Sequence, residues 1–123
     1  MSLEIQSERI DPDITVVRFS GSITVGRESQ TMLPFVQDLL QKNEKKLILE
    51  LSGIEHLDSS GVELLFECYS AAQSAAAQLR LASATPKVAR LFRITRLDTI
   101  MPFHETVAEA VAALRTPSVP SAR

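Results

Sequence analysis

The sequence predicts an α/β fold in which a mixed sheet of four to five strands carries about four helices, mainly on one face. Three observations support this prediction: a hairpin pattern near the N-terminus, an almost continuous apolar run at residues 47–51, and helical periodicity after residue 60. A short apolar run is typical of a strand that is covered on both faces, as in a parallel sheet. We therefore expect an antiparallel hairpin followed by parallel strands.

Residues 3–10 and 14–20 are predicted to form the hairpin. The first segment alternates apolar and polar residues, and the second is mostly β-branched and apolar. Asp11-Pro12-Asp13 between them has the composition of a turn. Ser20-Gly21-Ser22 is expected to end the second strand.

Residues 28–42 are predicted to form the first long helix. Proline in a helix interior costs about 3 kcal/mol, which makes Pro34 awkward at this position. If Thr31 is the N-cap, Pro34 falls in the first turn, where its missing N–H does no harm. We therefore expect a helix that starts late or has an irregular first turn. Its apolar stripe comprises Met32, Val36, Leu39 and Leu40.

The central stretch is predicted to be a strand, a serine-containing turn and a helix. The strand at residues 47–51 is interrupted by Ser52-Gly53, and two further apolar residues lead into Asp58-Ser59-Ser60-Gly61. The helix is expected from about Ser60 to Gln78. Its apolar stripe follows the i, i+3, i+4, i+7 spacing of one helix face, at Val62, Leu65, Phe66, Tyr69, Ala72 and Ala76.

The remaining chain predicts a strand at 79–82, a helix at 87–95, an edge strand at 100–103 and a final helix at 105–114. Residues 116–123 contain two prolines and two serines with little to bury, so a disordered tail is expected after a domain at 1–115. The predicted core comprises Ile48, Leu49, Leu51, Val62, Leu65, Phe66, Leu81, Val88 and Leu91.

Two roles are open for Ser59. As a helix-opening serine it could accept a hydrogen bond from an orphan backbone N–H and act as the N-cap. Asp58 or Ser60 could cap equally well, which would leave the Ser59 hydroxyl available for modification. A helix N-terminus favours an added anion, so a phosphate there is compatible with the helix.

The segment LILELSGIEHLDSSGVELLF resembles the signature of the STAS family, named for sulphate transporters and anti-sigma factor antagonists. Within the family it is most similar to the soluble bacterial anti-sigma factor antagonists. The later residues 79–81, 85–88 and 91–97 resemble the family's later strand and short helix. Where the family usually has Gly-Gly after its second helix this chain has Ala76-Ala77, so a stiffer, more helical exit is expected. Arg96 stands where the family more often has a glycine helix stop.

The resemblance implies a phosphorylation-switched regulator of transcription. The family's phosphorylation site is the first serine after the aspartate, which maps onto Ser59. The implied partners are an anti-sigma factor with serine kinase activity, which binds the unmodified protein, and a metal-dependent serine phosphatase. ATP and Mg²⁺ would belong to the kinase, so no cofactor is expected here. The expected partner-binding residues are Asp58, Ser59, Ser60, Gly61 and Thr24; Thr24 stands where the family often has an acidic residue.

A second hypothesis is a related domain that does not switch. Such domains serve as scaffold subunits of sensory assemblies or as accessory subunits of lipid or anion transporters. An enzyme is not expected, because no Gly-x-Ser-x-Gly elbow, Gly-rich phosphate loop or metal-ligand spacing is present. The role of the basic residues Lys87, Arg90, Arg93 and Arg96 is left open between a solvated face and a contact for an acidic partner.

Composition excludes other classes of function. The net charge is −2 and the pI is about 5.7, which does not favour nucleic-acid binding. The single cysteine, Cys68, fits a cytoplasmic protein and is predicted to be a packed core thiol. No apolar run is long enough for a membrane span and no signal peptide pattern opens the sequence. His56 and His104 are each expected to be alone in their surroundings.

Overall fold

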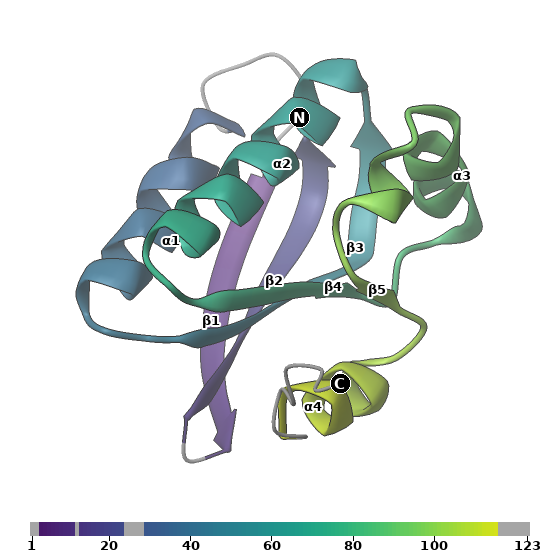
Figure 1. Ribbon diagram of the computed structural model, residues 1–123. Coiled ribbons are helices and arrows are strands. Elements are labelled where there is room, and N and C mark those ends of the chain that lie inside the picture. Colours follow the sequence, from purple (N-terminus) through teal and green to yellow (C-terminus); the bar gives the residue numbers. More distant parts are fainter. Residues whose placement is uncertain (1–2, 12, 24–28, 116–123) are drawn as a thin grey trace.

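The computed structural model describes residues 3–11, 13–23 and 29–115, which form one five-stranded mixed sheet with four α-helices (Figure 1). The strand order is β1-β2-β3-β4-β5, with β1 antiparallel to β2 and the later neighbours parallel. The elements are β1 (Leu3–Asp11), β2 (Ile14–Ile23), η1 (Ser29–Thr31), α1 (Met32–Gln41), β3 (Lys46–Leu57), α2 (Ser59–Ser74), β4 (Gln78–Ala82), α3 (Pro86–Ile94), η2 (Leu97–Thr99), β5 (Phe103–His104) and α4 (Val107–Arg115). The predicted mixed sheet is confirmed.

Helices cover the two faces of the sheet unequally. On one face α1 and α2 lie side by side and, together with α3, enclose the larger core around Leu47, Leu49 and Leu51 of β3 (Figure 1). On the other face α4 packs Ala110 and Leu114 against a smaller cluster contributed by β2, β3 and β4. The strand β3 is therefore buried on both faces, as its apolar run predicts.

Both central strands run further than the sequence predicts. The prediction that Ser20-Gly21-Ser22 ends β2 is wrong, since β2 continues to Ile23, and Ser52-Gly53 does not interrupt β3. The register between the two strands shifts between Arg18 and Ser20 and again between Gly21 and Ser22, as in β-bulges. Bulges let the parallel pairing continue past residues that weaken a strand on their own. The two strands consequently end together, with Ile23 beside Leu57.

The first helix starts late, as Pro34 predicts. Thr31 is the N-cap of α1, preceded by the 3-10 turn η1, and the proline lies inside the first helical turn. The missing N–H of Pro34 therefore costs no intrahelical hydrogen bond. Met32, Val36 and Leu40 form the buried stripe of α1, and Leu39 is only half-buried.

The exit from α2 corrects another expectation. The helix ends at Ser74 instead of continuing to Gln78, and Ala76 adopts a left-handed backbone with φ 58°. The N–H of Ala77 donates to the carbonyl of Ala72 at 2.8 Å, and that of Ala76 to Gln73 at 3.0 Å. This is the Schellman arrangement, which usually has glycine at the left-handed position. The alanines therefore make the turn that glycine makes elsewhere, at a steric cost.

The C-terminal elements partly differ from the predictions. The edge strand β5 comprises only Phe103–His104, and Ile100 lies before it, half exposed. Arg96 takes the left-handed backbone, φ 62°, that a glycine helix stop would take. The final helix is Val107–Arg115. The predicted tail at 116–123 lies outside the described residues.

Most of the predicted core is buried, with two exceptions. Phe66 and Leu91 are only half-buried. On α2 the fully buried position belongs to Cys68, while Phe66 lies on the flank near Tyr69, with ring centroids 6.5 Å apart. Leu91 lines a hollow beside α3. The buried members are Ile48, Leu49, Leu51, Val62, Leu65, Leu81 and Val88.

Gly61 holds the start of α2 close to the sheet. A Cβ atom at this position would lie 2.2 Å from the Ile23 carbonyl oxygen and 2.5 Å from Leu57 Cδ1. Distances this short are incompatible with a side chain unless the backbone moves. Only glycine therefore lets the first turn of α2 rest against the end of β2.

We predict that Gly61→Ala destabilises the fold by about 2 kcal/mol or more, because overpacking against a backbone atom outweighs the better helix propensity of alanine. The measurement is urea unfolding. Ser60→Ala, one residue earlier in the same helical turn, is the control and should change stability by less than about 1 kcal/mol. Equal stability of Gly61→Ala and wild type would show that the close approach is not a constraint.

We also predict that Ala76→Gly stabilises the protein by about 0.5–1 kcal/mol. The left-handed backbone costs alanine about 1–2 kcal/mol, a cost that glycine avoids. Glycine also has greater conformational freedom in the unfolded chain, which offsets part of the stabilisation. Thermal unfolding measures the difference. Ala75→Gly, at a residue with φ −91°, is the matched control and should be neutral or destabilising. A stabilisation by both substitutions would contradict the explanation.

Candidate functional site

The serine turn lies where the two central strands end and α2 begins. Asp58 follows β3 directly, and its backbone N–H donates to the carbonyl of Ile23 at 3.4 Å. Ser59 is the first residue of α2. In open α/β sheets, ligands and partners bind beyond the carboxyl ends of the strands, which is where this turn is located.

Asp58 is the N-cap of α2. Its backbone is extended, with φ −110° and ψ −175°, and its Oδ1 accepts a hydrogen bond from the N–H of Gly61 at 2.9 Å. Its carbonyl accepts the first intrahelical bond from Val62 at 3.0 Å. The aspartate thus satisfies one of the orphan donors at the helix start. Of the two roles considered for Ser59, capping is excluded by this geometry.

The Ser59 side chain is exposed, and within the described part of the chain its hydroxyl makes no hydrogen bond. Ser60 is half-buried and does not cap the helix either. The backbone N–H groups of both serines precede the first intrahelical donor, Val62, so the helix itself offers them no acceptor. An exposed hydroxyl therefore lies beside backbone donors at the positive end of a helix dipole.

The structure brings together four of the five predicted site residues. Asp58, Ser59, Ser60 and Gly61 form one turn, against the end of β2. Thr24 lies outside the described residues. Its neighbour Ile23 is the last residue of β2 and contacts the turn through its carbonyl oxygen.

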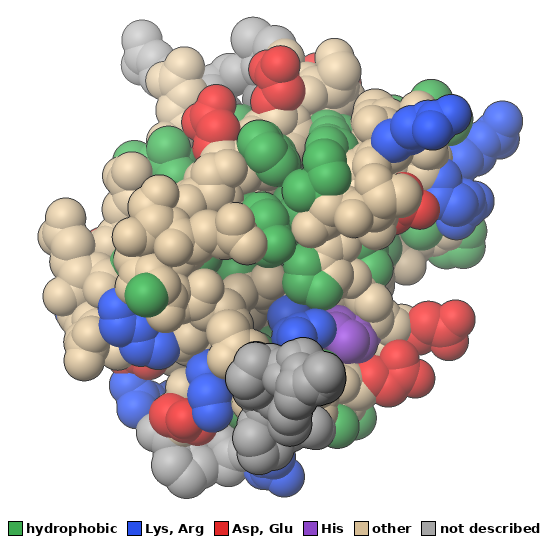
Figure 2. All heavy atoms as spheres, in the orientation of Figure 1, with side chains coloured by type: hydrophobic (Ala, Val, Ile, Leu, Met, Phe, Trp, Pro, Cys, Tyr) green, Lys and Arg blue, Asp and Glu red, His purple; other side chains and the backbone are tan. Residues whose placement is uncertain are grey.

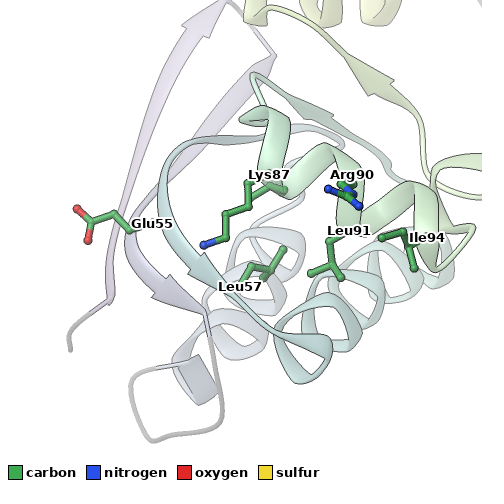
Figure 3. A pocket seen from close by; sticks show the side chains of 7 residues that line it. Glu55, Leu57, Lys87, Arg90, Leu91 and Ile94 are labelled. Carbon is green, nitrogen blue, oxygen red and sulfur yellow. The ribbon is translucent and has the colours of Figure 1, made fainter.

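A hollow beside the turn was missed at the sequence level. It has a volume of about 180 Å³ and lies between the C-terminal part of β3 and helix α3 (Figure 3). Its lining residues are Glu55, Leu57, Lys87, Val88, Arg90, Leu91 and Ile94. Four of the five lining residues from α3, at positions 87, 90, 91 and 94, have the i, i+3, i+4, i+7 spacing of one helix face, a pattern visible in the sequence. The sequence prediction instead placed Leu91 in the core and left the role of the basic residues open.

Among the described residues, Cys68 and His104 have shifted pKa values. Burial, with a smaller contribution from the neighbouring Glu67, raises the pKa of the Cys68 thiol to about 12, so the predicted core thiol is confirmed and stays protonated. The expectation that His104 is alone in its surroundings is wrong, because its Nε2 lies 3.0 Å from Nη1 of Arg80. Burial first, and the Arg80 cation second, lower the pKa of His104, while Glu109 acts in the opposite direction.

Two further properties of the described residues bear on the site. They contain no group of three or more His, Cys, Asp or Glu side chains that could hold a metal ion. None of the described helices combines the length and apolar composition that crossing a membrane requires. Among the described residues, Ser59 therefore lies next to the backbone donors of the helix start and to Asp58, and the hollow begins two residues earlier, at Leu57.

Comparisons with known proteins agree on one family. The family model for the STAS domain matches residues 6–110. A Thermotoga maritima protein named as a candidate anti-sigma factor antagonist is 30% identical over 78 residues, which are 63% of this chain and 69% of that protein. The structure of an anti-sigma factor antagonist from Mycobacterium paratuberculosis superimposes with a TM-score of 0.82 at 23% identity, over 93% of this chain and 95% of that one.

The Bacillus cell fate determinant SpoIIAA, an anti-sigma factor antagonist, has the same fold in two forms. The unphosphorylated form superimposes with a TM-score of 0.75 at 19% identity, over 91% of this chain and 96% of that one. The phosphorylated form gives 0.69 at 18% identity, over 91% and 100%. The family match includes β3, the serine turn and α2 in full. This chain therefore belongs to the STAS domain family.

Proposed function

We propose that this protein is a phosphorylation-switched anti-sigma factor antagonist. In its unmodified form it binds an anti-sigma factor that is also an ATP-dependent serine kinase, and so frees a sigma factor. Phosphorylation of Ser59 releases the partner, and a metal-dependent serine phosphatase restores binding. The observation that carries the proposal is the division of roles at the turn: Asp58 caps the helix, which leaves the exposed Ser59 hydroxyl without a structural task.

The named relatives support this proposal. A protein from Mycobacterium paratuberculosis and SpoIIAA from Bacillus are both named anti-sigma factor antagonists, and SpoIIAA exists in a phosphorylated form. Their fold is the fold of this chain, in which Ser59 begins the helix that follows the buried central strand. A regulatory binding protein of this kind needs no catalytic residues of its own.

The physics of the turn favours a switch that acts on binding and not on folding. A phosphate adds a charge of about −1.5 to −2 at pH 7. Next to the first turn of a helix an anion is stabilised by roughly 0.3–1 kcal/mol, and repulsion from Asp58 offsets part of this gain. A partner that covers the turn must instead desolvate the new charge, which costs several kcal/mol. The free-energy cost therefore falls on the complex.

The first prediction identifies the phosphate acceptor. Incubation with the cognate kinase and ATP should add about 80 Da, the mass of one phosphoryl group, to wild type and Ser60→Ala but not to Ser59→Ala. The physical reason is that Ser59 is exposed while Ser60 is half-buried in the first turn. Intact-protein mass spectrometry gives the answer. Addition of phosphate to Ser59→Ala would refute the assignment of the acceptor. If the wild-type protein binds the kinase but is never phosphorylated, the alternative of a scaffold or transporter subunit would be favoured.

The second prediction concerns the mechanism of release. Ser59→Asp should unfold within a few degrees of wild type yet bind the kinase at least about tenfold more weakly, a difference of roughly 1.4 kcal/mol. The carboxylate imitates only part of the phosphate charge, so the phosphorylated protein should bind more weakly still. Thermal unfolding and calorimetric titration measure the two quantities.

Ser59→Ala is the control for that experiment. It removes the hydroxyl without adding charge, so it should bind as wild type does and stay bound in the presence of ATP. Unfolding of Ser59→Asp at ordinary temperature, or undiminished binding by the phosphorylated protein, would contradict a local block at the turn.

A further inference from the structure

The hollow between β3 and α3 is a groove with an apolar floor. Leu57, Val88 and Leu91 contribute apolar side chains to it, and Ile94 lies at its edge with 66% of its surface exposed (Figure 3). An apolar cavity of about 150 Å³ admits a benzene molecule. At about 180 Å³ the groove therefore has room for one large side chain, such as leucine or phenylalanine.

The rim of the groove is basic. Lys87 and Arg90 line it, whereas Arg93 of the same helix does not, and α3 contains no acidic residue. Figure 2 shows Lys and Arg side chains gathered at the position of α3. Glu55 also lines the groove, but its carboxylate is directed away from the other side chains (Figure 3).

Within the described residues these rim cations form no ion pair, whereas several other basic residues do. Arg18, Lys42 and Lys46 form ion pairs with Glu8, Asp38 and Asp13 at 2.6, 3.0 and 3.0 Å. Neither Lys87 nor Arg90 has an ion pair with any residue that the structure describes. An apolar hollow bordered by unpaired cations is complementary to a segment that carries an apolar side chain next to carboxylates.

We propose that this groove binds an acidic segment of the protein partner, which inserts one large apolar side chain above Leu57 and Leu91 and places carboxylates on Lys87 and Arg90. The proposal rests on the proposed function, because the segment belongs to the same partner that contacts Ser59. Leu57 supplies the link: it lines the groove and directly precedes Asp58 and Ser59. One partner surface can therefore cover both the groove and the switch.

A protein segment fits the groove better than an anionic membrane does. A bilayer binds apolar side chains that protrude together from a surface. Here Leu57 and Leu91 are half-buried in a concavity, and of the described apolar residues that line it only Ile94 is exposed. A single inserted side chain reaches such a floor, whereas a flat bilayer does not.

The first experiment tests the groove without the partner. The full-length ¹⁵N-labelled protein is titrated with the peptide acetyl-Glu-Glu-Leu-Glu-Glu-Leu-Leu-Glu-amide, and amide shifts are followed by NMR. We expect shifts concentrated on residues 55–57 and 87–94, and binding at least about tenfold weaker in Lys87→Glu/Arg90→Glu. The control Lys42→Glu/Arg93→Glu has the same net charge and should bind within about twofold of wild type.

Three outcomes would overturn the inference from that titration. They are shifts scattered over the surface, equal weakening in both double variants, and binding to phosphatidylglycerol vesicles in preference to the peptide. Spectra of the free variants show whether each one is folded. Leu91→Ala should also weaken peptide binding, because it removes apolar floor while leaving the charges intact.

The second experiment uses the host's serine-kinase anti-sigma factors, each purified and titrated with the full-length protein. We expect Lys87→Glu/Arg90→Glu to bind at least about tenfold more weakly than wild type and the control, with the difference shrinking as salt rises. If Ser59→Asp weakens binding while the groove variant binds like wild type, the groove inference fails and the proposed function stands. If none of these kinases binds wild type, the proposed function fails, and with it the assignment of the segment to that partner.

Discussion

Burial of the first part of β3, residues 46–50, between helices on both faces and strands on both edges is the constraint on which the rest of the structure depends. The strand pairs with β2 and β4, packs Leu47, Leu49 and Leu51 under α1 and α2, and packs Ile48 toward α4. A strand held in this way cannot shift register without exposing apolar surface or losing backbone hydrogen bonds. Within the described residues the C-terminal part of β3 pairs with β2 alone, as far as Leu57. The position of the serine turn therefore depends on the β2–β3 register and on the close contact of Gly61 with Ile23.

At the serine turn, the residues that hold the helix start differ from Ser59, whose side chain is exposed. Asp58 satisfies the helix start, and Gly61 allows α2 to rest on the carbonyl of Ile23. Ser59 takes part in neither contact, so chemistry on its hydroxyl leaves the packing beneath it unchanged. An exposed side chain on a well-packed turn suits a modification that changes the binding of another protein. The free-energy cost of the modification then falls on the complex and not on the fold.

The groove beside α3 adds surface to the same end of the molecule. Leu57 links it to the turn, and Lys87 and Arg90, which have no ion pair among the described residues, border it. Charged rims mainly set the rate and specificity of association, while an inserted side chain contributes free energy through burial. A partner that covers both features would combine a selective contact with one that phosphorylation can disrupt.

The sequence by itself determined the hairpin, the buried central strand, the helix that follows it and the position of Ser59, because these depend on local periodicity and turn chemistry. Only the tertiary structure decided the rest. Pairing with β2 carried β3 past Ser52-Gly53, and a Schellman turn imposed a left-handed backbone on Ala76. Leu91 was expected in the core, but none of the described elements covers it fully, and so it lines a groove. Periodicity identifies which side chains share a face of a helix or strand; what packs against that face is set by non-local contacts.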